Sequence, residues 1–238
     1  MFRLDAVKSR IAATLLVACA AALLLAASSG AALIGIYRNN MESTGQRSQA
    51  VKLSGARCSR GGLGNALRVV VGKRTKECAY RTPVLGRDLE IAATERLLSA
   101  TPKPVRHGAF LAVNLRSGGE TRYQLAVYPL QKKVQLRKSL ADGSVEALDT
   151  ERNVAAVKGI DMANELRLRA FNLTEKGDKK GDCRLLAFVG GKLVSDVTDE
   201  GAGDLSGRAS GFSVGSAKNA KGAQASFDDV VVRVPSPF

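Results

Sequence analysis

The sequence predicts an all-β fold, an antiparallel β-sandwich, preceded by one N-terminal transmembrane α-helix. Three observations support this prediction. A long uncharged segment lies near the N-terminus, many short segments after it alternate apolar with polar residues, and glycine-rich polar turns separate those segments. Apolar residues make up 45% and charged residues 24% of the 238 residues, a globular composition that excludes a wholly disordered chain.

The uncharged segment extends from Ile11 to Ile36. At about 1.5 Å per residue, a helix of this length crosses a hydrocarbon core of about 30 Å. Arg3, Lys8 and Arg10 precede it, so the positive-inside rule places the N-terminus in the cytoplasm. We therefore expect a cytoplasmic segment at 1–10, a transmembrane helix at 11–36, a polar tether at 37–50 and an extracytoplasmic domain at 51–235, in a single-pass protein of the cell membrane.

Two other interpretations of this segment stay open. Leu16–Cys19 resembles a bacterial lipobox, in which Cys19 is lipidated after cleavage, and Ser29 and Ala31 form an A-x-A-like signal-peptidase site. However, the residues from Ala20 to Ile36 stay apolar, where a mature lipoprotein usually has a polar tether. We therefore prefer an uncleaved anchor, with Cys19 as a small apolar residue of the helix.

The exterior part has the periodicity of strands. Tyr123–Tyr128 and Leu166–Phe171 alternate with a period of two, and Leu67–Val71 is a β-branched run suited to a sandwich interior. Gly190 and Gly191 separate two further apolar runs, which predicts a two-residue hairpin. We expect about ten strands and no helix in this part, although Ala92–Ala100 has some helical character.

The order of these segments resembles the concanavalin A-like lectin/glucanase superfamily, in particular its laminin-G-like and keto-disaccharide-hydrolase-like bacterial members. The similar segments are Asp88–Ile91, Tyr123–Val127, Asn164–Leu168, Phe188–Val194 with Asp196 and Asp199, Gly207–Phe212 and Ala225–Val232. The resemblance implies a jelly roll of two curved sheets. It does not imply a function, because function in that superfamily is not fixed by fold.

Glucanases of this superfamily carry catalytic carboxylates on a concave strand, in the pattern E-x-D-x-x-E. Here the nearest match starts at Asp88 or at Glu90. Ala93 stands at the last position of the first register, and Ala92 stands at the central position of the second. Because acid, nucleophile and orienting group must face one bond, we predict no catalytic residue. A glycoside hydrolase remains the alternative.

Three cysteines follow the expected membrane segment, where disulfides are chemically permitted. Cys58 and Cys78 bracket the Leu67–Val71 run, and we expect them to form a disulfide. Cys183 is then a free thiol, although a pairing of Cys183 with either of the others stays open. Zinc is not expected, because scattered cysteines without a C-x-x-C pattern lack ligand spacing.

The resemblance also implies a cofactor. Related jelly rolls often hold a structural calcium ion near the terminal strand, with an aspartate and backbone carbonyls as ligands. Asp228 is the candidate ligand in this chain. The alternative is that Asp228 is an ordinary polar residue of a turn and strand.

The net charge of +14 predicts a polyanionic partner or, alternatively, high solubility alone. Lys132, Lys133, Arg137 and Lys138 form the predicted basic patch, which we expect to lie on solvated faces. No aromatic-and-basic nucleic-acid motif is present. The sequence therefore predicts a non-catalytic module that binds carbohydrate or another anionic envelope polymer at the cell surface. A structural partner of another envelope protein is a further alternative.

Overall fold

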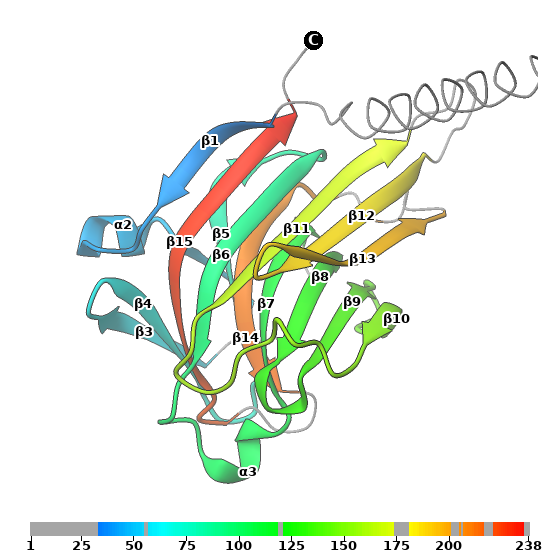
Figure 1. Cartoon of the computed structure of the whole chain (residues 1–238). Helices are drawn as coiled ribbons and strands as arrows, with labels where there is room; N and C mark the ends of the chain where they lie inside the picture. Colours follow the sequence, from blue (N-terminus) through cyan, green and yellow to red (C-terminus); the bar gives the residue numbers. More distant parts are fainter. Residues whose placement is uncertain are drawn as a thin grey trace, which may run out of the picture. The chain divides into compact units, whose positions relative to one another are not determined.

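The computed structural model describes residues 33–235 except 55–56, 119–120, 174–180, 201–204, 206 and 217–220. Residues Ile34–Val234 form one compact unit of two β-sheets packed face to face (Figure 1). The prediction of an all-β sandwich is thus confirmed. The predicted cytoplasmic segment and residues 11–32 of the predicted membrane helix lie outside the described residues. Among the residues that are described, no helix is long and apolar enough to cross a membrane.

One sheet has eight strands in the order β13-β12-β11-β6-β15-β4-β3, and β1 also pairs with β15. Its registered pairings are antiparallel. Its strands are β1 (Leu33–Asn39), β3 (Cys58–Leu63), β4 (Ala66–Val71), β6 (Leu89–Leu97), β11 (Asn164–Leu173), β12 (Asp182–Val189), β13 (Lys192–Asp199) and β15 (Gln224–Pro235).

The other sheet has seven strands in the order β10-β9-β8-β7-β14-β5-β2, all antiparallel. Its strands are β2 (Val51–Ser54), β5 (Glu77–Leu85), β7 (Ala109–Gly118), β8 (Thr121–Tyr128), β9 (Lys133–Ser139), β10 (Val145–Glu151) and β14 (Ala209–Ser216). Short helices α2 (Thr44–Ser48), α3 (Lys103–Arg106) and the 3-10 turn η1 (Pro129–Gln131) lie at the ends of strands.

The core lies between the two sheets and is built from alternate residues of the strands, whose side chains point inward. Phe212 of β14 stacks on Tyr80 of β5, with ring centroids 6.0 Å apart, and packs against Phe227 of β15 at 4.6 Å. These contacts join the seven-stranded sheet to the eight-stranded sheet. Contacts of large apolar side chains across the layers provide most of the driving force for such a sandwich.

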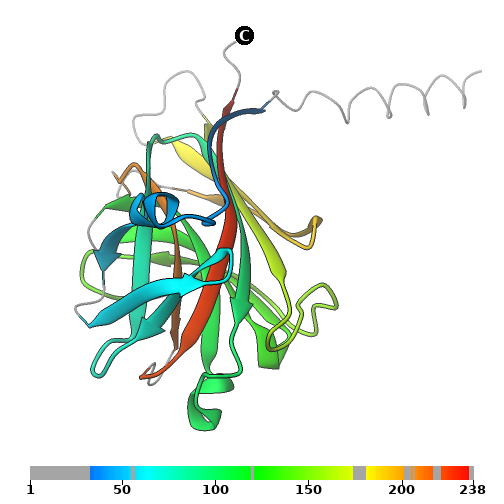
Figure 2. The same cartoon turned by 90° about the vertical axis from the view of Figure 1, so that its left-hand side faces the viewer.

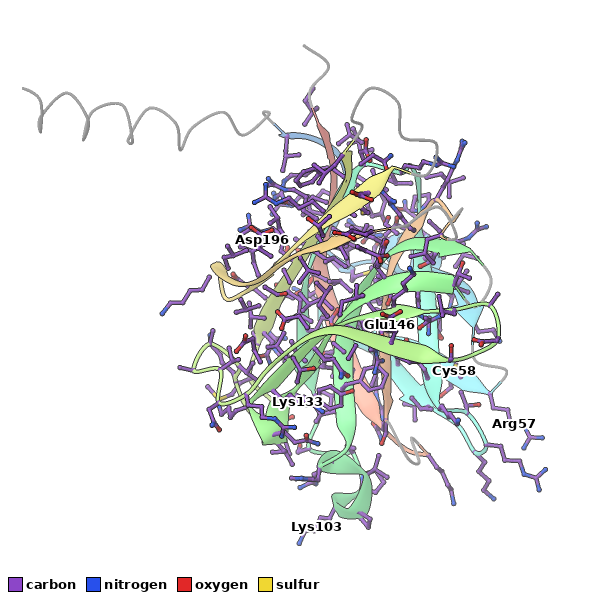
Figure 3. The ribbon with its side chains drawn as sticks, turned by 90° about the vertical axis from the view of Figure 1, so that its right-hand side faces the viewer. Arg57, Cys58, Lys103, Lys133, Glu146 and Asp196 are labelled. Carbon is purple, nitrogen blue, oxygen red and sulfur yellow. A yellow bond between two sulfur atoms is a disulfide. The ribbon has the colours of Figure 1, made fainter. Side chains whose placement is uncertain are left out.

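The two sheets also meet along one side, where their edge strands β13 and β10 lie. Figure 3 views this side, with Asp196 labelled on β13 and Glu146 on β10. The Ser195 hydroxyl donates a hydrogen bond to the Asp149 carboxylate and joins the two strands. The hairpin predicted at Gly190-Gly191 connects β12 and β13, and both glycines have positive φ, as a type I′ turn requires.

The predicted boundaries near the N-terminus are wrong. Leu33–Ile36, the end of the predicted membrane helix, belongs to strand β1, which lies with α2 on the side of the sandwich seen in Figure 2. The predicted tether at 37–50 is also structured, because Met41 and Ala50 are buried in the core. Ser43 and Gln46 form a capping box at the start of α2. These residues are polar, so their composition predicted a tether although their spacing is that of a helix start.

Ala92–Ala100 is likewise not helical, because Ala92 to Leu97 continue strand β6. Tertiary pairing decides the conformation here. Strand β6 lies between β11 and β15, and its odd-numbered residues face the core. Alanine and glutamate favour helices only weakly, so pairing on both sides overrides their propensity.

Cys58 of β3 and Cys78 of β5 form a disulfide, with Cα atoms 5.9 Å apart. Because β3 belongs to the eight-stranded sheet and β5 to the seven-stranded sheet, the bond ties the two layers together. Cys183 is a buried free thiol, and burial is the main reason that its pKa is raised to about 11. A thiol with that pKa is protonated at neutral pH and unreactive.

Candidate functional site

The central strands β7, β8 and β14 of the seven-stranded sheet are buried on both faces. Leu111, Val113 and Leu115 of β7 point into the core, as do alternate residues of β8. The side chains between them point to the outer face, yet they are buried as well. We call the following outer-face residues the concave cluster: Glu77, Phe110, Ala112, Asn114, Arg122, Gln124, Ala126, Tyr128, Arg137 and Ser213.

The face that bears this cluster is strongly curled. Arg122 Nη2 lies 2.6 Å from Glu77 Oε2, although β8 and β5 are separated by β7 and β14. In a flat sheet, strands this far apart in order have backbones about 14 Å apart. Only curl and twist bring the two side chains together. The outer face is therefore concave, and long side chains from its two flanks meet across it.

Gln124 lies at the centre of the polar half of the cluster. Its Nε2 lies 2.7 Å from Glu77 Oε1, 2.8 Å from Asn114 Oδ1 and 3.0 Å from Ser213 Oγ, and its two N–H groups are shared among these three acceptors. Its Oε1 accepts a hydrogen bond from Arg137 Nε. One amide thus joins strands β5, β7, β14 and β9 to its own strand β8. A fully connected buried network of this kind holds each member in one orientation.

Aromatic rings form the other half. The Arg137 guanidinium lies 4.3 Å from the centroid of Phe110, and its Nη1 donates to Tyr128 Oη at 3.1 Å. Phe110 and Tyr128 are tilted neighbours with centroids 5.7 Å apart, and Lys133 Nζ lies 3.7 Å from the Tyr128 ring. Stacking and hydrogen bonding together hold the planar guanidinium of Arg137 in one orientation, between the polar half and the aromatic half of the cluster.

The electrostatics of the cluster are dominated by cations. Burial alone would raise the pKa of Glu77, but Arg122, Arg137 and hydrogen bonds from Ser213 and Gln124 lower it below its ordinary value. Burial, followed by repulsion from Arg152 and Arg137, lowers the pKa of Lys133. Glu77 is therefore ionised at neutral pH, and it is the only carboxylate among the described members of the cluster.

Arg122 is not fully satisfied by its neighbours. Its side chain is 7% exposed and Glu77 is 13% exposed. Glu77 bonds only to Nη2, while Nε and Nη1 are buried without a hydrogen-bond partner among the described residues. A buried donor without a partner costs free energy, about 1–3 kcal/mol and more when it is charged. The cluster therefore retains an unmet capacity to bind an acceptor.

The predicted basic patch is not one solvated surface, and this correction follows from strand alternation. Arg137 is only 8% exposed and points into the concave cluster, whereas Lys138, the next residue, points into the sandwich. Neighbours along a strand must face opposite sides. Lys132 is exposed at the turn before β9 and Lys133 is half-buried over Tyr128; Figure 3 labels Lys133.

Lys138 belongs to a second polar group inside the sandwich. Its Nζ lies 2.9 Å from Asp199 Oδ2, which also accepts a hydrogen bond from Tyr123 Oη. Burial is the main reason that the pKa of Tyr123 is raised, and the hydrogen bond to Asp199 adds to it. Lys138 is thus a structural residue that neutralises a buried carboxylate.

Asp228 lies in β15 at a bulge, next to Asp229, which has positive φ. Its Oδ1 accepts a hydrogen bond from the Asp229 backbone N–H. Within the described ranges, no three side chains of histidine, cysteine, aspartate or glutamate come close enough to hold a metal ion. The calcium ligand role of Asp228 stays a prediction from the resemblance.

A shallow groove of about 350 Å³ lies on the outer face of the eight-stranded sheet. Ala92 and Thr94 line it, together with Arg167 and Arg233. Its arginines already have partners, since Arg233 bonds to Glu90 at 2.7 Å and Arg167 stacks on Phe188 at 4.0 Å. Among the described residues that line this groove, no buried donor lacks a partner as Nε and Nη1 of Arg122 do.

Sequence analysis missed most of the concave cluster. It selected Lys133 and Arg137 for their charge but passed over Glu77, Arg122 and Gln124. A usable signal was present: Arg122 and Gln124 are long polar residues on the face of β8 opposite Tyr123 and Leu125. That pattern predicts a polar outer face, but not that the sheet curls enough to bury it.

Comparison with known proteins supports the fold. No family model and no curated protein matches the sequence. Among solved structures, the carbohydrate-binding module CBM66 of Bacillus subtilis is 15% identical, with a TM-score of 0.51 over 76% of this chain and 93% of its own. A Bacillus subtilis protein of unknown function with a galectin-like fold is 14% identical, with a TM-score of 0.53 over 85% and 97%.

The alginate lyase Aly36B also has this architecture, with 11% identity and a TM-score of 0.51 over 84% of this chain and 95% of the lyase. Identities this low show similarity of fold alone. They place the chain among β-sandwiches that include a carbohydrate-binding module, a galectin-like protein and a lyase.

Proposed function

We propose that this chain is a non-catalytic binding module for carbohydrate or another anionic polymer of the cell envelope, and that the concave cluster is its binding face. The observation that carries the proposal is the unmet hydrogen-bonding capacity of Arg122 inside a cluster of amides, arginines and aromatic rings. Ligand sites combine apolar surface with a few fixed polar groups in this way. The shared fold with a carbohydrate-binding module supports the same ligand class.

An enzyme is the second candidate, since an alginate lyase has the same fold. A glycoside hydrolase needs two carboxyl groups about 5–10 Å apart on one face. The described part of the concave cluster contributes Glu77, and that carboxylate is occupied by Arg122 and Gln124. This arrangement supports binding better than hydrolysis.

We further propose that residues 11–32 anchor the module in the cell membrane, with the described domain outside the cytoplasm. The segment is uncharged and long enough, at about 1.5 Å per residue, to cross about 30 Å of hydrocarbon. The disulfide between Cys58 and Cys78 supports an exterior location, because disulfides persist in oxidising compartments.

Binding to a panel of neutral and acidic envelope polysaccharides, measured calorimetrically with the full chain in detergent, tests the function. We expect at least one polymer to bind without release of reducing ends, and Arg137→Gln to weaken it about tenfold or more. Arg184→Gln is the matched control, since Arg184 pairs with Asp196 on the other sheet. Release of product would favour the enzyme. Capture of an envelope protein with no polysaccharide bound would favour a structural partner.

A further inference from the structure

The ion pair between Glu77 and Arg122 uses only part of the hydrogen-bonding capacity of each group. Oε2 of Glu77 bonds to Nη2 of Arg122, and Oε1 bonds to Gln124 instead. A guanidinium and a carboxylate frequently form two parallel hydrogen bonds. Here the Arg122 side chain reaches the carboxylate with one nitrogen, and its Nε and Nη1 have no hydrogen-bond partner in the described part of the chain.

The charges around this bond do not balance. Arg122 and Arg137 both act on Glu77, and Lys133 lies beside them on the Tyr128 ring. Arg152 faces Lys133 and adds a further positive charge. Glu77 is the one carboxylate that opposes these cations among the described residues of the cluster. A second negative group would therefore be attracted by several cations here, and this attraction opposes the cost of removing the group from water.

We propose, on the basis of the proposed function, that the concave cluster recognises a uronic-acid unit whose planar carboxylate binds Arg122 in place of Glu77. The structure already has a carboxylate at that position, so a carboxylate of the ligand fits it. The incoming group satisfies Arg122 with two hydrogen bonds where Glu77 supplies one. Glu77 then turns away and remains ionised, so the exchange needs no proton transfer.

The geometry of Glu77 suits a group that leaves. Glu77 lies near the start of β5, which pairs with β14 on one side and β2 on the other. Its side chain is more exposed than that of Arg122. Arg122 lies on β8 between β7 and β9 and keeps its position through strand pairing. Glu77, the more exposed member of the pair, gives up its hydrogen bonds to Arg122 and Gln124 when it turns away.

Matched oligosaccharides test this inference. The probes are tetrasaccharides of mannuronate, guluronate, galacturonate and glucuronate, each compared with its carboxyl-reduced neutral counterpart by calorimetry on the full chain. We expect at least one uronate to bind about 10- to 100-fold more tightly than its neutral counterpart. Equal binding of both would overturn the inference and leave the proposed function intact, whereas no binding of any sugar would overturn both. A sulfated neutral tetrasaccharide that binds as well as the uronate would also overturn the carboxylate assignment.

Two variants identify the residues. Glu77→Gln removes the competing carboxylate and should tighten uronate binding about tenfold, while Asp196→Asn, in the exposed pair with Arg184, should change nothing. Arg122→Gln should abolish the preference for the uronate, and Arg122→Lys should restore it only in part, because lysine lacks the planar fork. Unchanged discrimination in a folded Arg122→Gln variant would refute the role of Arg122. The wild-type comparison decides the inference even where a variant fails to fold.

Discussion

Glu90 and Glu95 lie on the same strand, β6, but their side chains leave its opposite faces. Glu90 points outward and bonds to Arg169 at 2.8 Å and to Arg233 at 2.7 Å. Glu95 points into the core and is fully buried, and neither of its oxygens has a hydrogen-bond partner among the residues that the structure describes. The β6–β11 register is continuous between them, so no bulge brings them together. Two carboxyl groups on opposite faces cannot act on one glycosidic bond.

Glu95 should make stability fall as pH rises. Burial raises its pKa well above the ordinary value, so the folded state keeps it protonated. A group with a raised folded pKa stabilises most below its unfolded pKa, about 4.3, and that contribution is lost as pH rises toward the folded pKa. Relative to wild type, Glu95→Gln should therefore gain about 1.4 kcal/mol per pH unit across this window.

Urea unfolding of wild type and Glu95→Gln at several pH values between 4 and 8 measures this gain. Parallel stability curves for the two proteins would show that Glu95 is not protonated in the folded state. The comparison removes the contribution of the other titrating groups, because both proteins share them.

The contribution of Glu77 to stability should depend on pH in the opposite direction. The folded pKa of Glu77 is lowered by Arg122 and Arg137 despite burial, so its contribution is present above the unfolded pKa and is lost as pH falls through the folded pKa. Glu77→Gln should cost about 3 kcal/mol at pH 7, because it leaves the Arg122 charge buried without its partner. The cost should shrink in acid, and thermal unfolding at pH 7 and pH 3 measures it. A cost independent of pH would mean that packing, not charge, is lost.

Lys132 and Lys138 both belong to the predicted basic patch, but replacing each by glutamate should change stability by different amounts. Lys138→Glu places a second carboxylate beside Asp199 inside the sandwich, and should cost more than about 3 kcal/mol. Lys132→Glu, at an exposed turn position, should cost less than about 1 kcal/mol. Denaturant unfolding of both variants checks the contrast, and equal costs would contradict the buried position of Lys138.

Loss of the disulfide should destabilise the sandwich measurably. Cys58 and Cys78 are separated by 20 residues, and on the chain-entropy model closing a loop of this size contributes about 3 kcal/mol. The double variant Cys58→Ser, Cys78→Ser should lose that amount in urea unfolding. Wild type under strong reductant is the control and should match the variant. A difference between them would indicate that the serines, rather than the missing bond, alter stability.

Reporter fusions should place the C-terminus outside the cytoplasm. The basic residues Arg3, Lys8 and Arg10 before the uncharged segment predict this orientation. Alkaline phosphatase fused after Phe238 should be active, and a reporter that works only in the cytoplasm should be silent there. The reverse pattern would contradict the proposed topology, and release of the domain into the medium would indicate cleavage of the segment.

Local patterns in the sequence determined much of the sandwich. Alternation with period two located β8 and β11, because a strand with one buried face must place every second side chain inward, and Leu125 and Leu168 are buried in the structure accordingly. Gly190-Gly191 specified a hairpin, because only residues that tolerate positive φ close a two-residue turn. These features depend on neighbours along the chain.

Tertiary structure alone decided where distant side chains meet. Glu77 and Arg122 come from strands three positions apart in the sheet, and their contact depends on its curl and twist. The same holds for residues 37–50, whose polar composition predicts a tether but whose apolar residues Met41 and Ala50 are buried in the core. Periodicity records which face of a strand a residue occupies. Curvature accumulates over many strands, and it determines whether that face is solvated or closes into a buried cluster.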